Sequence, residues 1–132
     1  MAGYSGTPLP RKLGIKDGSR VALVNVPAEV SKELKSALAS CKAVQAKPID
    51  FVLLTATSES ELRKHFPVWS SKLAPAGMLW VSWPKKSSGV PSDLDENVVR
   101  KIGLADGLVD VKVCAVNDTW SGLKFVIRLK DR

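Results

Sequence analysis

One stretch, residues 50–86, limits the folds open to this chain more than any other part of the sequence. An apolar segment over 50–55 is followed by a helical pattern from residue 58, and a second apolar segment over 78–83 begins after Gly77. A strand, a helix and a second strand in this order form one right-handed βαβ unit of a parallel sheet. The stretch therefore predicts an α/β protein built on a parallel sheet.

The helix inside this unit has signals for both of its ends. Ser58 and Glu61 have the spacing of a capping box, with Ser58 as the N-cap. Pro67 is expected to kink the helix or to split it in two, and Gly77 to end it through a positive φ. The apolar stripe that the helix buries consists of Leu62, Phe66, Trp69 and Leu73.

The residues before this unit predict a further strand and two helices. Thr7 is expected to cap a short helix that has Pro8 at its first position. An apolar strand over 20–25 follows, and Pro27 then opens a second helix. Residues 42–49 form either a link or a short edge strand, because Pro48 prevents a longer one.

The C-terminal residues predict a helix and an antiparallel hairpin. Ser92 or Asp93 caps the helix, which runs to about Ala105. Val109–Val116 is the expected partner of a final strand that alternates between apolar and mostly basic residues. The apolar face of that strand consists of Leu123, Phe125, Ile127 and Leu129.

These elements predict one α/β domain over residues 1–132, with residues 1–6 flexible. Its architecture is a three-layer Rossmann-like sandwich. The sheet is mostly parallel and has a C-terminal antiparallel hairpin.

Charge is the one unusual feature of the composition. The chain has a net charge of +7 and a pI near 9.6. Residues 1–47 contain eight Lys or Arg against three Asp or Glu. A basic surface favours an anionic ligand or protein partner, or nucleic acid bound through this N-terminal third, although a solvated surface also explains the charge. No nucleic-acid-binding motif and no series of exposed aromatics accompanies the basic residues.

The cysteines and the N-terminus favour a cytoplasmic protein. Cys41 and Cys114 are far apart among apolar neighbours, which is typical of buried free thiols, although a disulfide remains open. One His and no Cys-x-x-Cys pair leave a zinc site almost without ligands, so no metal is expected. The N-terminus lacks the apolar segment of a signal peptide, and no apolar run is long enough to span a membrane.

Candidate ligand-binding residues follow the strands of the parallel sheet, because ligands of such sheets bind at the carboxyl ends of the strands. The loop from Lys85 to Gly89 combines two lysines, two hydroxyls and a glycine before a helix, and this combination favours an anion. A flexible solvated loop is the alternative. The candidate set is Asn25, Thr55, Thr57, Trp83, Lys85, Lys86, Ser87, Ser88, Gly89 and Trp120.

Trp120 differs from the other candidates because it lies in the hairpin loop. An exposed indole is a plausible binding anchor, whereas an indole folded back on the core buries a large apolar area. The sequence provides no acid–base pair and no base close to either cysteine, so no catalytic residue is assigned.

Two features of the 50–86 stretch are similar to a known fold. Asp50 opens a buried strand, and the helix is followed by Leu-Ala-Pro-Ala-Gly before the next strand. This resembles the fourth and fifth strands of class I S-adenosylmethionine-dependent methyltransferases, and the hairpin resembles their sixth and seventh. The resemblance implies closely spaced glycines after the first strand and an acid after the second. Val-Asn-Val-Pro after the first strand has no glycine, and the second strand is vestigial, so no cofactor is expected.

The whole chain also resembles a family of short stand-alone bacterial proteins of unknown function with a methyltransferase-like core. The likeness rests on YSGTPLPRKLGIKDGSRVALVN, LAPAGMLWVSWPKKSSGV and DLDENVVRKIGLADGLVDVKVCAVNDTWSGLKFV. It implies a cytoplasmic Rossmann-like protein and no catalytic residues.

The sequence therefore favours a non-enzymatic binding or regulatory protein that has lost S-adenosylmethionine binding and contacts an anionic partner through the Lys85–Gly89 loop. A divergent transferase with a nucleotide-like cofactor is one alternative. Nucleic-acid binding by the basic N-terminal third is the other.

Overall fold

The computed structural model describes residues 7–132, so the flexibility expected of residues 1–6 lies outside the described part of the chain. The helices are α1 (Leu9–Leu13), α2 (Ala28–Leu38), α3 (Glu59–Ser70) and α4 (Glu96–Ala105), with short 3-10 turns η1 (Lys86–Ser88) and η2 (Leu129–Asp131). The strands are β1 (Arg20–Val24), β2 (Lys42–Ala43), β3 (Ile49–Thr55), β4 (Leu73–Pro84), β5 (Leu108–Ala115) and β6 (Trp120–Ile127).

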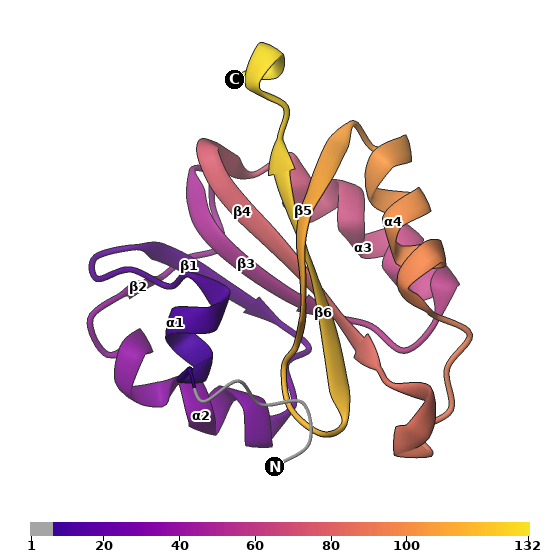
Figure 1. Ribbon diagram of the computed structural model, residues 1–132. Helices are drawn as coiled ribbons and strands as arrows, with labels where there is room; N and C mark the ends of the chain where they lie inside the picture. Colours follow the sequence, from indigo (N-terminus) through magenta and orange to yellow (C-terminus); the bar gives the residue numbers. More distant parts are fainter. Residues whose placement is uncertain (1–6) are drawn as a thin grey trace.

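The strands form one sheet in the order β2-β1-β3-β4-β6-β5 (Figure 1). The first four strands are parallel, β6 runs antiparallel to β4, and β5 runs antiparallel to β6. The expected mostly parallel sheet with a C-terminal hairpin is thus confirmed. The 42–49 segment, for which the sequence left two alternatives, forms a two-residue edge strand beside β1.

Alternation along β3 and β4 divides the core into two layers. Phe51 and Leu53 pack with α1 and α2, whereas Val52 and Leu54 pack with α3 and α4. All four side chains are almost completely buried. A strand that is apolar on both faces needs cover on both faces, and the result is a three-layer sandwich.

Single contacts fix the helices on this sheet. On the α1 side, the indole Nε1 of Trp80 in β4 donates a buried 2.8 Å hydrogen bond to the carbonyl of Leu13 at the end of α1. On the other side, the rings of Phe66 in α3 and Phe125 in β6 meet edge to face with their centroids 5.2 Å apart. Both contacts join residues distant in sequence, so they tie the layers together.

The ends of α3 are partly as expected. Ser58 is the N-cap and accepts a hydrogen bond from the Glu61 N–H, while the Glu61 carboxylate accepts from the Thr57 N–H. Pro67 does not split the helix, which is continuous to Ser70. One missing N–H near the end of a helix costs few backbone hydrogen bonds.

The role expected of Gly77 was wrong. The helix ends at Ser70, its C-cap residue Ser71 has a right-handed backbone, and Gly77 lies inside β4 without a positive φ. The pairing of β3 with β4 is irregular here, since Ile49 faces Leu73 and Phe51 already faces Met78. A Cβ on Gly77 would lie 2.6 Å from the Ile49 carbonyl oxygen, so close packing of backbones requires the glycine.

Two expected helix caps were also wrong. α1 begins at Leu9 with Pro8 in the N-cap position, and no side chain, including that of Thr7, caps it. α4 begins only at Glu96, because the Asp95 carboxylate accepts a 2.9 Å hydrogen bond from the Val98 N–H and so provides the cap.

Two strand and helix boundaries moved by one residue or more. Pro27 is the N-cap of α2, one position before the helix starts. β6 ends at Ile127, and Leu129, which was expected on the inner face, is 80% exposed in η2. The alternating pattern continues past the last pairing partner on β5, so Leu129 has no sheet neighbour to pack on.

We expect Gly103→Ala to lower the free energy of unfolding by about 1–3 kcal/mol, the usual cost of overpacking a core. An alanine would normally favour the α4 helix, but its Cβ would lie 2.1 Å from the Phe125 ring, which Phe66 holds in place. Urea denaturation measures the difference. The exposed Lys101→Ala in the same helix should stay within about 0.5 kcal/mol of wild type. A Gly103→Ala protein as stable as wild type would contradict this packing.

Candidate functional site

The carboxyl ends of β1, β3 and β4 lie at one edge of the sheet, which is the edge where the sequence places a ligand. Asn25 turns the chain after β1 in a left-handed conformation with φ 55°, which asparagine tolerates better than most residues. Its side chain is exposed. Thr57, after β3, is also exposed.

Other candidate residues at this edge are buried. Thr55 is 4% exposed, and its hydroxyl has no hydrogen-bond partner among the described residues. Trp83 is 5% exposed and belongs to the core on the α3 side. Trp120 is folded back on the core, and its indole N–H donates to the Glu29 carboxylate at 3.0 Å. Trp83 and Trp120 therefore belong to the core and offer little surface to a ligand.

The Lys85–Gly89 loop is organised by its own hydrogen bonds. The Ser88 hydroxyl donates to the Lys85 carbonyl at 2.6 Å and accepts from the Val90 N–H at 3.2 Å. The Lys85 N–H donates to the Thr119 carbonyl, which fixes the loop to the hairpin. Lys86 and Ser87 remain exposed, and Gly89 provides a positive φ.

The helix after this loop is not available to an anion in the way the sequence indicated. Six residues separate Gly89 from α4, and the Asp95 carboxylate already caps its N-terminus. The Asp93 carboxylate accepts from the Glu59 N–H at 2.7 Å, so the start of α3 also faces an acid. The helix N-terminus therefore drops out of the expected combination, and the loop residues themselves are left.

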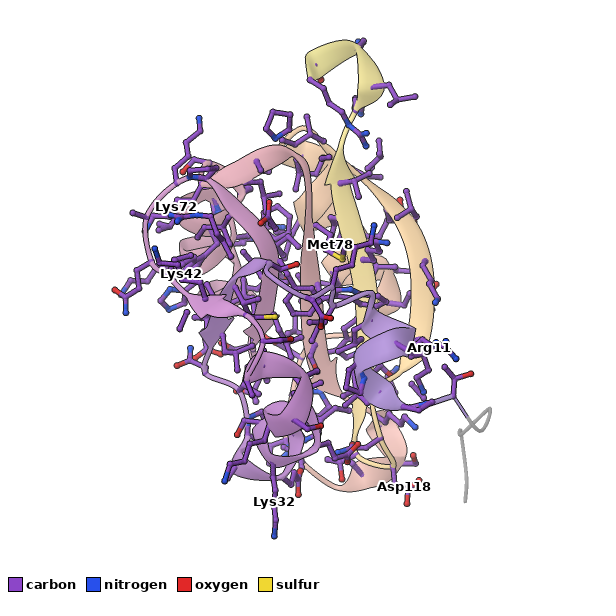
Figure 2. All side chains as sticks on the ribbon, turned by 90° about the vertical axis from the view of Figure 1, so that its left-hand side faces the viewer. Arg11, Lys32, Lys42, Lys72, Met78 and Asp118 are labelled. Carbon is purple, nitrogen blue, oxygen red and sulfur yellow. The ribbon has the colours of Figure 1, made fainter. Side chains whose placement is uncertain are left out.

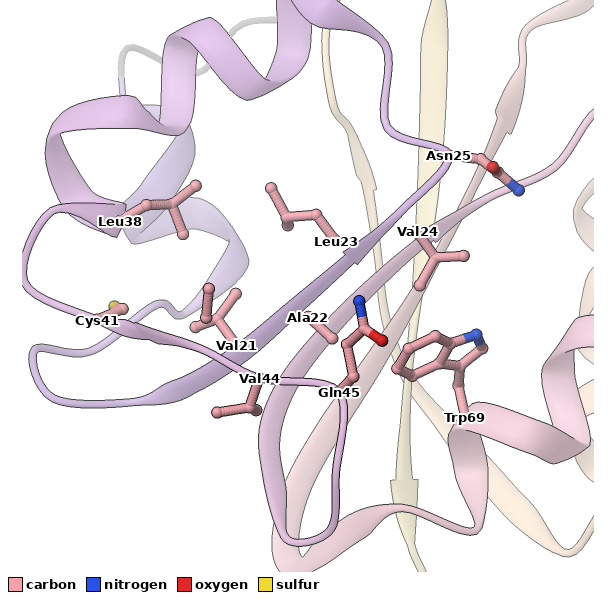
Figure 3. Close-up of a pocket in the computed structure, with 11 residues that line it drawn as sticks. Val21, Ala22, Leu23, Val24, Asn25, Leu38, Cys41, Val44, Gln45 and Trp69 are labelled. Carbon is pink, nitrogen blue, oxygen red and sulfur yellow. The ribbon is translucent and has the colours of Figure 1, made fainter.

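A pocket of about 630 Å³ lies beside β1, and the sequence analysis did not identify most of its residues (Figure 3). It is open because β2 has only two residues. After Val44 the chain turns back, and the Arg20 guanidinium holds this return by donating to the carbonyls of Ala46 and Pro48. The pocket is lined by Val21, Ala22, Leu23, Val24, Asn25, Leu38, Cys41, Ala43, Val44, Gln45 and Trp69.

The pocket extends around the edge of the sheet. Leu23 and Leu38 pack with the core on the α2 side, whereas Val24 and Trp69 pack with the core on the α3 side. Its polar lining groups include the carboxamides of Asn25 and Gln45 and the thiol of Cys41, and no lining residue is charged. The pocket therefore suits a largely apolar ligand with a few neutral hydrogen-bonding groups.

Two lysines, Lys42 and Lys72, lie next to residues that line this pocket. The Lys72 ammonium lies 4.4 Å from the centre of the Trp69 ring, and Lys42 belongs to β2. Figure 2 shows both side chains on the side of the molecule formed by the β2 edge. In the sequence, only Pro48 pointed to this pocket, because a proline at this position limits the length of β2.

Cys41 and Cys114 are free thiols, as expected, but each is only partly buried. The Cys41 thiol is within hydrogen-bond distance of the carbonyls of Lys16 and Ala37. Burial raises the pKa of the Cys114 thiol, and the nearby Lys12 and Lys112 oppose this rise in part. Residues 7–132 contain no group of three or more His, Cys, Asp or Glu that could hold a metal ion.

Comparisons with known proteins show which solved structures share this fold. No family model and no curated protein matches the sequence. Among solved structures, a SAM-dependent methyltransferase from Aquifex aeolicus matches with a TM-score of 0.63 and 19% identity over 91% of this chain and 88% of that one. Magnesium protoporphyrin IX methyltransferase from Synechocystis PCC 6803, with bound SAH, matches with a TM-score of 0.61 and 11% identity over 91% and 78%. The chain has a methyltransferase-like fold.

At such identities the likeness concerns the fold, and function has to be argued from the site. The pyocyanin biosynthetic protein PhzM is likewise similar in fold but not in sequence. It matches with a TM-score of 0.65 and 12% identity over 91% of this chain and 53% of that one. In the described part of the chain, no helix is both long and apolar enough to cross a membrane.

We expect Cys114 to react with iodoacetamide more slowly in the native protein than in the urea-unfolded chain at pH 8, because its raised pKa lowers the thiolate fraction. A Cys41→Ser variant leaves Cys114 as the only thiol. The native rate should rise as the pH increases toward the raised pKa. Equal native and unfolded rates at pH 8 would show that the thiol is not held neutral by burial.

Proposed function

We propose that this protein is a non-enzymatic binding or regulatory protein of methyltransferase-like fold, that it does not use S-adenosylmethionine, and that it contacts an anionic partner. The observation that carries the proposal is the lining of the pocket at β1, which has no acidic side chain. A methyltransferase-like site needs an acid for the ribose hydroxyls and a glycine-rich turn for close backbone approach. Here Gln45 follows β2, and Asn25 and Pro27 follow β1.

The residues of the pocket do not fit that cofactor. Neutral carboxamides can accept hydrogen bonds at their oxygen, but they cannot supply the charge of a carboxylate. The loop after β1 carries side chains where glycines would leave space. No step of methyl transfer is therefore assigned to this chain.

An anionic partner is supported by charge that the fold does not neutralise. The described salt bridges join Arg63 to Glu59 and Arg100 to Glu96 and Asp110. These arginines lie on α3 and α4. None of these salt bridges involves a lysine at the strand ends. Lys86, with the exposed Ser87, is positioned to contact a partner at the carboxyl edge of β4.

A divergent transferase with a nucleotide-like cofactor is the second candidate. It is supported by the volume of the pocket, which falls in the usual range for small-molecule sites, and by the unpartnered Thr55 hydroxyl near the strand ends. It requires stoichiometric binding of a small ligand near Asn25, Thr55 and Trp83. Nucleic-acid binding by residues 1–47 requires instead a steep dependence on salt.

Titration of the purified protein with S-adenosylhomocysteine by calorimetry should give no binding heat, and the melting temperature should not change. The physical reason is that the pocket lacks the acid and the glycine turn that would hold the ligand. A SAM-dependent methyltransferase titrated with the same solution serves as the positive control. One-site binding at micromolar affinity or tighter would overturn the proposal in favour of the transferase.

Replacing Lys85 and Lys86 by Glu should lower the salt concentration at which the protein elutes from immobilised heparin, used as an anionic probe. Both side chains belong to a loop that is fixed to the hairpin at Thr119, and the melting temperature should fall by no more than a few degrees. Replacing the exposed Lys32 and Lys35 of α2 by Glu changes the net charge equally and is the matched control. Equal elution of the two variants would remove the loop from the proposal.

A further inference from the structure

Three lysines that are distant in sequence lie together on the α1 side of the sheet. Lys112 in β5 and Lys124 in β6 are direct cross-strand partners. Lys16 follows α1 and is close enough to Lys124 to lower its pKa. We call Lys16, Lys112 and Lys124 the lysine cluster. The Lys112 ammonium also donates a 3.1 Å hydrogen bond to the carbonyl of Lys12, which joins β5 to α1.

The order of the strands leaves this part of the sheet open. β6 and β5 form one end of the sheet, and α4 packs against their other face. On the cluster side, α1 lies beside the hairpin, and Figure 1 shows no helix over it there. The lysine cluster therefore occupies a shelf that is formed by two strands and bordered by α1.

Charge on this shelf is not balanced within the described residues. No described carboxylate forms a salt bridge with Lys16, Lys112 or Lys124. Of the acids nearest in sequence, Asp110 forms its salt bridge with Arg100, and Asp17 accepts a hydrogen bond from the Ser40 hydroxyl.

Keeping these lysines together costs free energy. Like charges directly opposite each other on neighbouring strands destabilise a sheet. Lys124 is partly buried, and burial, Lys112 and Lys16 all lower its pKa. An anion at this place would remove the repulsion and restore the favourable environment of the charged ammonium groups. The arrangement is therefore suited to a bound anion.

The lysine cluster has a chemistry that favours phosphate. Its members are point charges without an arginine fork, and lysine ammonium groups bind phosphate oxygens in this way. Three positive groups need an anion of several charges. The cluster is compact, because two of its members share one cross-strand pair, so it suits a small ligand more than an extended polyanion.

We propose that Lys16, Lys112 and Lys124 form a binding site for a compact polyphosphate anion. The site is separate from the Lys85–Gly89 loop. It rests on the proposed function in one respect, since the lysine cluster and the loop would each bind an anion. Free tripolyphosphate and the phosphate chain of a nucleotide share this chemistry.

Calorimetric titration with tripolyphosphate at fixed low ionic strength tests the site. The wild-type protein should bind with one site, and the Lys112→Gln/Lys124→Gln variant should bind about tenfold more weakly or worse. The Lys32→Gln/Lys35→Gln variant, with the same loss of charge on α2, should bind like wild type. Equal affinity of the two variants, or no binding by wild type, would overturn the inference.

Further arms separate this site from the loop and identify the source of the phosphates. If only the Lys85→Glu/Lys86→Glu variant binds tripolyphosphate more weakly, the ligand binds at the loop and the lysine-cluster site is overturned. If tripolyphosphate does not bind at all, the lysine-cluster site is overturned, and the heparin experiment still tests the loop. ATP titrated in the same way should bind like tripolyphosphate if the phosphates alone are recognised, and more tightly if the nucleoside also contacts the shelf. A DNA duplex that binds more tightly than either would replace the compact ligand.

A second measurement does not depend on the lysine variants being folded. Cys114 lies near Lys112. Tripolyphosphate bound at the lysine cluster should slow alkylation of Cys114 in the Cys41→Ser protein, while glutathione in the same solution reacts at an unchanged rate. Unchanged alkylation of Cys114 at saturating tripolyphosphate would count against the site.

Discussion

Burial of β3 and β4 on both faces is the constraint on which the rest of the structure depends. Successive side chains of Phe51–Leu54 point into opposite cores, and each core needs its own helices. Trp80 on β4 carries this constraint to α1, because its buried indole N–H donates to the Leu13 carbonyl at the end of that helix. The three layers follow from the apolar composition of two strands and not from any property of the helices alone.

The pocket beside β1 and the lysine cluster both lie where the helices no longer cover the sheet. Neither end of the sheet has complete cover on both faces. At one end the short β2 leaves the pocket beside β1. At the other end the β6–β5 hairpin is covered by α4 on one face and carries Lys112 and Lys124 on the other. Both proposed binding sites therefore lie where the structure departs from its central pattern.

The chain has a methyltransferase-like fold, and the proposed function separates that fold from the chemistry that usually accompanies it. A sheet of this order can be stabilised by its core alone, and its loops are free to change because they contribute little to that core. In this chain Asn25 provides a left-handed turn without glycine, and Pro27 stands at the start of α2. The similarity to enzymes of known activity therefore describes the scaffold, and the proposed binding role follows from the side chains placed on it.

The sequence by itself determined the features that depend on neighbouring residues: the βαβ unit, the Ser58 cap and the alternation of the final hairpin. It failed where a distant atom decides the outcome. Gly77 looked like a helix end but is required by the Ile49 carbonyl, and Leu129 continues an alternation that has lost its partner strand. The pocket and the lysine cluster were decided by tertiary structure alone. Local patterns record which face of an element is apolar, whereas strand order sets which distant side chains meet.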